Sequence, residues 1–415
     1  MYTYSKAVPG LSAIRSAPFV KLVDDYETGL VETGYTSHVV RFHLHSVAHF
    51  GVWIELEGVE LGTINEATVA AFERHRRPHC RCPATSRSRG RTVVSCIRVF
   101  LQHLRKQGKV QAADPPSQPR LLVSQFLQWM TAHRGVVGTT VSSYQLYVTN
   151  LVDSLGDDPQ TYTAKGLRDF IAQRYRHYGC TSIRMVLAAV RMFLRYLAVE
   201  GRCRAGLDQA LTSPAIWSQQ SLPLGLTSDE VQRILTLCPS TPAGIRDRGV
   251  LLLLTRLGLR ASDVAALRLR DVCFEAATIK VSGKGSREVQ LPLPQEVGDA
   301  LLEYLRRGRP PIASDYFFLR AVAPFRPFGG RRPGHAVKYI AQAALRRAGI
   351  QRPKRGAHVF RHTAACQMLR ADVGLESIAE VLRHRSIETT GIYAKVDIQL
   401  LTQVAQPWPE EASCN

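Results

Sequence analysis

The most informative segment of this chain is Leu257-Gly258-Leu259-Arg260-Ala261-Ser262-Asp263. Residues 245–257 predict a helix whose apolar second half is buried, and Gly258 can end that helix. Ser262 can cap a second helix that follows. Arg260 is therefore expected in a tight turn between two anchored helices, which is a rigid mount for a guanidinium group. An isolated arginine in a turn is usually just solvated, so a functional role for Arg260 depends on the other motifs in the sequence.

Two motifs downstream of this turn carry cationic or titratable side chains. Residues 274–281 and 287–291 predict two strands joined by a glycine-containing turn, so Lys284 is expected at the tip of a β-hairpin. In the stretch HVFRH, His358 and Arg361 are three residues apart and share one face of a predicted helix. A cation beside a titratable histidine suits a phosphate better than a metal, because arginine does not ligate metals.

The last motif is LRHRS followed by TTGIY, which places His384 and Tyr393 nine residues apart. On one continuous helix these two side chains would point to opposite sides, at 100° per residue. Ser386 can begin a new short helix, and a break there would allow the two side chains to converge.

The order and spacing of these motifs closely resemble the tyrosine recombinase (phage integrase) family. LGLRASD, SGKGSRE, HVFRH and LRH with TTGIY match the family's pattern, and the resemblance covers residues 120–400. One departure is Asp263, where many members have Glu, and this carboxylate is still expected to brace Arg260. The resemblance implies a catalytic set made of Arg260, Lys284, His358, Arg361, His384 and Tyr393.

The resemblance also implies the chemistry of that set. The two arginines would hold the non-bridging oxygens of a DNA phosphate, and His384 would donate a further hydrogen bond. Tyr393 would attack phosphorus, with His358 or a phosphate oxygen accepting the phenol proton, and Lys284 would protonate the leaving 5′-oxygen. The product would be a 3′-phosphotyrosine and a free 5′-hydroxyl. Neither a metal nor another cofactor is expected, and the sequence has no Walker loop.

The length of 415 residues suggests two to three domains at about 150 residues each. Proline-rich or non-helical breaks divide the chain into residues 1–115, 117–212 and 220–415. The first two segments show similar helical patterns and are interpreted as diverged copies of a DNA-binding unit, or else as two unrelated bundles. The third mixes helix and strand. The expected fold class is mainly α with a small antiparallel sheet, in which helical DNA-binding domains precede a DNA breaking-rejoining catalytic domain.

The charge of the chain points to a polyanionic partner. There are 54 Lys and Arg against 34 Asp and Glu, a net charge of +20, and this balance favours double-stranded DNA with specific recombination sites as the partner. A membrane is not favoured, because the longest aliphatic run is far shorter than the roughly 20 apolar residues of a spanning helix. The expected phosphate contacts, which could instead be a solvated basic face, are Arg76, Arg77, Arg87, Arg89, Arg91, Arg184 and Arg191.

One cluster allows two interpretations. The stretch HRRPHCRC, residues 75–82, offers four potential zinc ligands. Structural zinc sites usually gather ligands from two separated pairs, and the interleaved arginines would repel Zn²⁺. We therefore favour a basic DNA-contacting loop over a metal site. The nine cysteines are too few for a disulfide scaffold, and they indicate a reducing, cytoplasmic compartment. The family resemblance implies that this is the cytoplasm of a bacterium.

The sequence predicts a site-specific recombinase or integrase of a mobile element. A short apolar stripe is present at Val396, Leu400, Leu401 and Val404. The resemblance implies that this segment docks on a neighbouring protomer in a homotetramer on DNA, with accessory recombination proteins as further partners. A DNA-relaxing enzyme of the type IB topoisomerase kind would use the same chemistry. A catalytically silent DNA-binding protein is the alternative of a different class.

Overall fold

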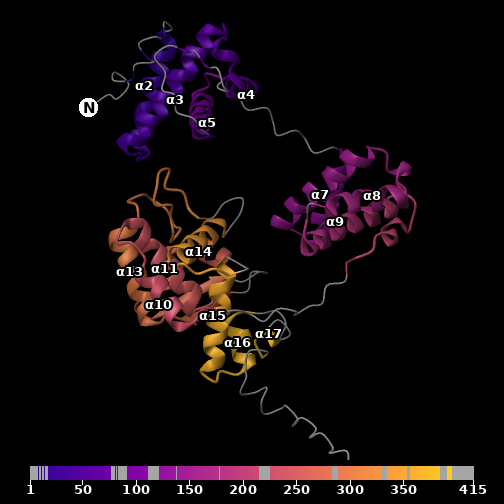
Figure 1. Ribbon diagram of the computed structural model, residues 1–415, viewed down its shortest axis with the longest axis vertical. Helices are drawn as coiled ribbons and strands as arrows, with labels where there is room; N and C mark the ends of the chain where they lie inside the picture. Colours follow the sequence, from indigo (N-terminus) through magenta and orange to yellow (C-terminus); the bar gives the residue numbers. More distant parts are fainter. Residues whose placement is uncertain are drawn as a thin grey trace, which may run out of the picture. The chain divides into compact units, whose positions relative to one another are not determined.

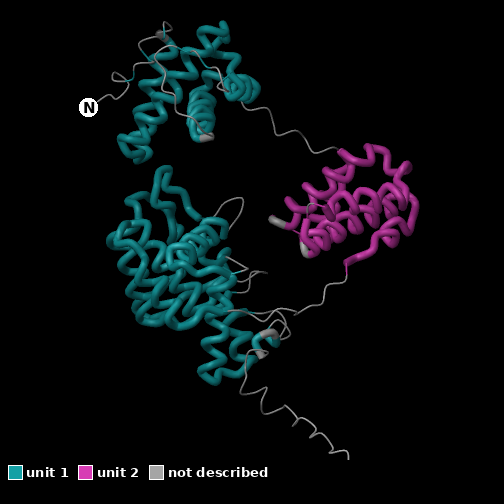
Figure 2. The backbone as a smooth tube through the Cα atoms, viewed as in Figure 1, with its two compact units in different colours: residues 1–113, 222–415 teal, residues 114–221 magenta. Residues whose placement is uncertain are grey.

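The computed structural model is mainly helical, with one small antiparallel sheet (Figure 1). The predicted fold class is therefore confirmed. The structure describes residues 8, 11, 14, 17–75, 80, 82, 91–110, 121–136, 138–176, 178–214, 225–282, 288–328, 334–352, 356–383 and 390–394. The chain divides into two compact units, one made of residues 114–221 and the other of residues 1–113 with 222–415 (Figure 2).

The N-terminal helices surround a core of their own. They are α2 (Ala17–Glu32), α3 (Ser37–Leu56), the 3₁₀ helix η2 (Leu61–Thr63), α4 (Glu66–His75) and α5 (Arg91–Lys106). Their apolar faces meet in one hydrophobic cluster in which Phe50, Phe72 and Phe100 are almost fully buried. Every residue of α3 from Ser46 to Ile54 is buried, so this helix is enclosed by its neighbours on all sides over that stretch.

Residues 121–211 repeat the same order of elements. They form α6 (Leu121–Arg134), α7 (Thr139–Leu155), the 3₁₀ helix η3 (Pro159–Thr161), α8 (Ala164–Tyr175), α9 (Cys180–Val199) and a further 3₁₀ helix, η4 (Leu207–Ala210). The hydroxyl of Thr163 caps α8 by accepting from the backbone N–H of Gly166 at 3.1 Å. Phe126, Leu187 and Phe193 lie in the core of this unit.

The C-terminal part contains the remaining helices and the sheet. Its helices are α10 (Ser228–Thr236), α11 (Pro242–Arg256), α12 (Ala261–Ala266), η5 (Leu269–Asp271), α13 (Gln295–Glu303), the π-helix η6 (Tyr304–Gly308), α14 (His335–Arg347), α15 (Ala357–Arg370), α16 (Leu375–Val381) and α17 (Gly391–Ala394). Residues 249–255 of α11 are buried without interruption, which makes this helix the centre of the core. Thr227 and Glu230 form a capping box at the start of α10, with bonds of 3.2 and 2.9 Å.

The sheet has the strand order β1-β2-β3 and is antiparallel throughout. Its strands are β1 (Val272–Cys273), β2 (Thr278–Ser282) and β3 (Glu288–Pro292). The prediction of one strand from residue 274 was wrong at its start. Phe274 to Ala277 form a turn, in which the N–H of Ala277 donates to the carbonyl of Phe274 at 3.3 Å and Ala277 has a φ of 49°. A strand residue cannot adopt that φ, so β2 begins only at Thr278.

Three large hydrophobic clusters occupy separate stretches of the chain, residues 8–110, 122–211 and 226–360. The division of the chain into domains at residues 1–115, 117–212 and 220–415 stays a prediction. Within the described residues, we find no helix that has both the length and the apolar character needed to span a membrane.

Candidate active site

The turn that carries Arg260 depends on a glycine. Gly258 has a φ of +58°, and a Cβ at this position would lie 2.5 Å from Cδ2 of Leu382. The backbone conformation and the close approach both require glycine here. Arg260 itself occupies the N-cap position of α12, and its backbone N–H donates to Oδ2 of Asp263 at 3.3 Å. The prediction that Ser262 caps this helix was wrong, since Ser262 lies inside its first turn.

Arg361 joins three separate segments. It projects from α15, is 6% exposed, and donates to the backbone carbonyls of Gly258 and Leu382. Burial, with the nearby charges of Arg260 and Arg383, lowers the pKa of Arg361 to about 10. The guanidinium group therefore stays protonated at neutral pH, in a place where cations crowd together.

Arg383 completes this arrangement and was not predicted from the sequence. Its side chain is 6% exposed and donates to Oδ2 of Asp263 at 2.5 Å, and its backbone carbonyl accepts from Nη2 of Arg260 at 2.8 Å. Its φ of +53° is in the left-handed region, which is unusual for a residue other than glycine. No spacing in the sequence indicates that Arg383, rather than a neighbouring arginine, turns inward.

We call Arg260, Arg361, Arg383 and Asp263 the arginine cluster. It contains three guanidinium groups and one buried carboxylate, so its net charge is positive. Among the described residues, Nε and Nη1 of Arg383 have no hydrogen-bond partner although both are buried. Buried donors of this kind ordinarily find a partner. The cluster is therefore suited to an anion with several acceptor oxygens, such as a phosphate.

Asp263 braces the turn in a different way from the one expected. It accepts from the backbone of Arg260 and from the side chain of Arg383. The guanidinium group of Arg260 instead bonds to the backbone carbonyl of Arg383.

The phenol of Tyr393 lies in a small apolar cluster formed with Ala365, Cys366, Ile378 and Leu382. Its residue is 2% exposed, and burial raises the pKa of the phenol to about 12, although the positive charge of Arg361 opposes this rise. α16 ends at Val381 and Tyr393 lies on the separate helix α17, whereas the break expected at Ser386 falls outside the described residues. Tyr393 thus lies within the electrostatic reach of the arginine cluster.

His362 is the histidine that contacts this phenol. The oxygen of Tyr393 and Nδ1 of His362 lie 2.8 Å apart and share a hydrogen bond. The two rings pack edge to face, with centroids 5.7 Å apart. Sequence reasoning chose His358 because it shares a face of α15 with Arg361, whereas His358 is exposed in this structure. Lys284 and His384 lie outside the described residues.

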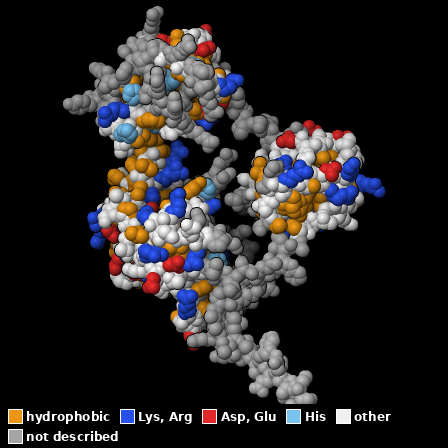
Figure 3. All heavy atoms as spheres, viewed as in Figure 1, with side chains coloured by type: hydrophobic (Ala, Val, Ile, Leu, Met, Phe, Trp, Pro, Cys, Tyr) orange, Lys and Arg blue, Asp and Glu red, His pale blue; other side chains and the backbone are white. Residues whose placement is uncertain are grey.

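The predicted DNA-contacting arginines have different surroundings. Arg184 is exposed on α9. Arg191 is half-buried and donates to the carbonyl of Leu211 at 2.6 Å and to the hydroxyl of Ser213 at 2.9 Å, which gives it a structural role. Lys and Arg side chains stand on the visible face of both units (Figure 3). The side chains of Arg76, Arg77, Arg87, Arg89 and Arg91 lie outside the described part of the chain.

Comparison with known proteins identifies relatives along the whole chain. Residues 225–399 match the sequence model of the phage integrase family. The integrase/recombinase y4rA of Sinorhizobium fredii (strain NBRC 101917 / NGR234) is 33% identical and aligns over 99% of this chain and 98% of its own length. The tyrosine recombinase XerC of Xanthomonas axonopodis pv. citri (strain 306) is 30% identical over 68% of this chain and 94% of its own length.

Solved structures share the fold. The site-specific recombinase XerH, in a post-cleavage complex with its palindromic difH substrate, superposes with a TM-score of 0.52 at 19% identity. The match covers 85% of this chain and 98% of that structure.

Proposed function

We infer from its membership of the phage integrase family that this chain is a tyrosine-type site-specific recombinase, which cuts and rejoins DNA. The observation that carries this function is the convergence of Arg260, Arg361 and Arg383 beside the tyrosine of α17. These side chains are distant in sequence, and their gathering creates a buried cationic site next to a nucleophile. A DNA phosphodiester is the substrate that such a site fits.

We propose that Arg260 and Arg361 bind the non-bridging oxygens of the phosphate that is attacked. The backbone bonds of Arg361 fix its orientation before DNA arrives, so little reorganisation is needed when negative charge develops at phosphorus. An incoming phosphate would also satisfy the buried donors of Arg383. His384 would add a further hydrogen bond to the phosphate.

In the proposed cleavage step, the oxygen of Tyr393 forms a bond to phosphorus, and the bond from phosphorus to the 5′-oxygen breaks. The phenol proton passes to His358 or to a phosphate oxygen, and the 5′-oxygen takes a proton from Lys284. The reversal of this step by a 5′-hydroxyl of a second duplex joins the exchanged strands. The energy of the original bond is kept in the phosphotyrosine.

The DNA-free chain is proposed to be inactive because its nucleophile is sheltered. A phenol that is 2% exposed, hydrogen-bonded to His362 and with a pKa of about 12 is a poor nucleophile at neutral pH. Attack therefore requires the phenol to leave His362 and move toward the arginine cluster. DNA binding would supply the phosphate that makes this move favourable.

We propose that the N-terminal helices add to the contact with DNA and that the chain acts as part of an assembly. Residues 17–106 repeat the helix order of residues 121–199, which supports a second DNA-binding unit of the same kind. The arginines proposed to contact DNA phosphates are Arg76, Arg77, Arg87, Arg89, Arg91 and Arg184. The chain is proposed to act in the bacterial cytoplasm as a homotetramer, with accessory proteins, for a mobile element. Deletion of residues 396–415, which lie outside the described residues, should impair assembly and spare DNA binding.

Sequencing of new DNA junctions in cells that express the chain tests this function. Wild-type protein should produce junctions that recur at one DNA sequence, and a Tyr393→Phe variant should produce none. If junctions do not exceed those of the variant while the purified chain relaxes supercoiled DNA of any sequence, the chain is a relaxing enzyme of the type IB kind. If neither activity is found and DNA still binds, the chain is a silent DNA-binding protein.

A further inference from the structure

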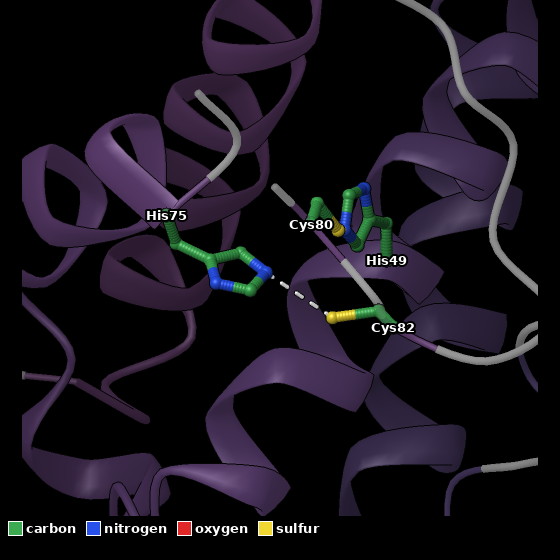
Figure 4. Close-up of side chains that lie close together, drawn as sticks. All are labelled: His49, His75, Cys80 and Cys82. Carbon is green, nitrogen blue, oxygen red and sulfur yellow. Dashed lines mark hydrogen bonds between the residues drawn. The ribbon is translucent and has the colours of Figure 1, made fainter. Parts of the chain in front are cut away.

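Four potential metal ligands meet in the N-terminal part of the chain (Figure 4). They are one nitrogen each from His49 and His75 and the sulfur atoms of Cys80 and Cys82, and all four lie within 4.8 Å of one another. Nε2 of His49 is 3.1 Å from the sulfur of Cys80, and Nε2 of His75 is 3.2 Å from the sulfur of Cys82. Figure 4 shows the four side chains pointing toward a common centre.

The two histidines are held in place by the helices that carry them. His49 lies on the buried stretch of α3, and His75 is the last residue of α4. The ring of His49 packs edge-on against Phe72 with centroids 5.0 Å apart, and the ring of His75 lies 5.8 Å from that of Trp53. The core thus holds two ligands in place, and one of them, His49, comes from a helix that is distant in sequence from the other three ligands.

The sequence-based argument against a metal rested on four ligands within one short stretch. The structure adds His49 from the earlier helix α3 to His75, Cys80 and Cys82, while His79 lies outside the described residues. Two cysteine thiolates cancel the charge of Zn²⁺, so the completed site would be neutral, and the arginines next to the ligands in sequence would not repel it.

The donor set selects the metal. Two thiolates and two imidazoles are a tetrahedral zinc set. Zinc bonds of about 2.3 Å to sulfur and 2.0 Å to nitrogen imply ligand-to-ligand distances of about 3.6 Å. The observed distances of 3.1 and 3.2 Å and the limit of 4.8 Å bracket that value, so changes of about an ångström in the ligand separations would complete the tetrahedron.

We propose that His49, His75, Cys80 and Cys82 bind one structural Zn²⁺, which ties the segment after α4 to the core of α3. This inference is independent of the recombinase function. The segment that the ion would anchor leads into the arginine-rich residues 81–91. The ion would therefore fix where this basic stretch leaves the helical core.

Metal analysis of the full-length protein tests the proposal. Protein purified under reducing conditions should contain about one zinc per chain, and X-ray absorption should show a first shell of two sulfur and two nitrogen atoms. Cobalt(II) substituted for zinc should give the visible absorption of tetrahedral cobalt with two thiolates. The Cys80→Ser and Cys82→Ser variants should lose the bound zinc.

Two variants serve as matched controls. Cys180→Ser changes an exposed cysteine of another unit, and His38→Gln changes an exposed histidine of α3 itself. Both should keep the full zinc content. Wild-type protein that neither contains nor takes up zinc or cobalt would overturn the proposal, as would a metal shell without two sulfur atoms. Because the absorption measurement uses the wild type, it decides the question even if a cysteine variant fails to fold.

Discussion

Substitution of Asp263 by Asn should loosen the whole active-site turn. The variant keeps the size of the side chain and removes the one buried negative charge of the arginine cluster. Asp263 is 8% exposed and receives a 2.5 Å bond from Arg383, whose side chain is 6% exposed. Removal of one partner from a buried ion pair costs about 3–5 kcal/mol, and the remaining amide oxygen still accepts a weaker bond. We therefore expect the free energy of unfolding to fall by about 3 kcal/mol.

Hydrogen–deuterium exchange of peptides from α11 and α12 measures this loss within the C-terminal part alone. A change of about 3 kcal/mol corresponds to a drop in protection of roughly a hundredfold. Asp315→Asn is the matched control, because its pair with Arg268 spans 3.6 Å and its side chain is 87% exposed, and it should change protection little. Arg383→Gln should partly restore protection in the Asp263→Asn background. Equal effects of the two aspartate substitutions would refute the reasoning.

Three further predictions concern a glycine, two arginines and the buried phenol. Gly258→Ala should lower the melting temperature clearly more than Gly349→Ala, since both glycines have positive φ but nothing lies within 4 Å of a Cβ at Gly349; equal shifts in calorimetry would contradict this. Arg184→Ala should leave the melting temperature unchanged and reduce the salt dependence of DNA binding by about one charge. Arg191→Ala should instead lower the melting temperature, because it loses the bonds to the carbonyl of Leu211 and the hydroxyl of Ser213. A fall in melting temperature for Arg184→Ala alone would reverse these two roles. Burial raises the pKa of Tyr393 from 10.0 to about 12, so the folded state holds the phenol proton more tightly than the unfolded state does. The resulting contribution to the free energy of unfolding is complete below pH 10 and is lost as the pH rises toward 12. The free energy of unfolding of the wild type should therefore fall relative to that of Tyr393→Phe over this range, and a constant difference would exclude a buried phenol.

Local sequence patterns predicted the helix that precedes Gly258 and the turn at this glycine. They also indicated that His384 and Tyr393 can converge only if a helix breaks between them, and residues 384–389 lie outside the described part of the chain. The prediction of where the strand β2 starts was wrong because Ala277 has a positive φ, and nothing in the sequence of this turn indicates that conformation.

Contacts between distant residues were harder to predict. Arg383 enters the cluster through a left-handed backbone conformation, and His362 rather than His358 reaches the phenol because of how α17 packs on α15. His49 joins His75, Cys80 and Cys82 only after α3 and α4 have packed together. These contacts depend on tertiary packing, so the spacing of residues along the chain does not predict them.

The decisive experiment identifies the amino acid that becomes attached to DNA. A nicked duplex that carries the recombination site would trap the cleaved state, and mass spectrometry of the digested complex would locate the linkage. The account predicts a 3′-phosphate ester on Tyr393 and no covalent complex with Tyr393→Phe, which should still bind the duplex. A linkage to another residue, or equal trapping by the phenylalanine variant, would contradict it.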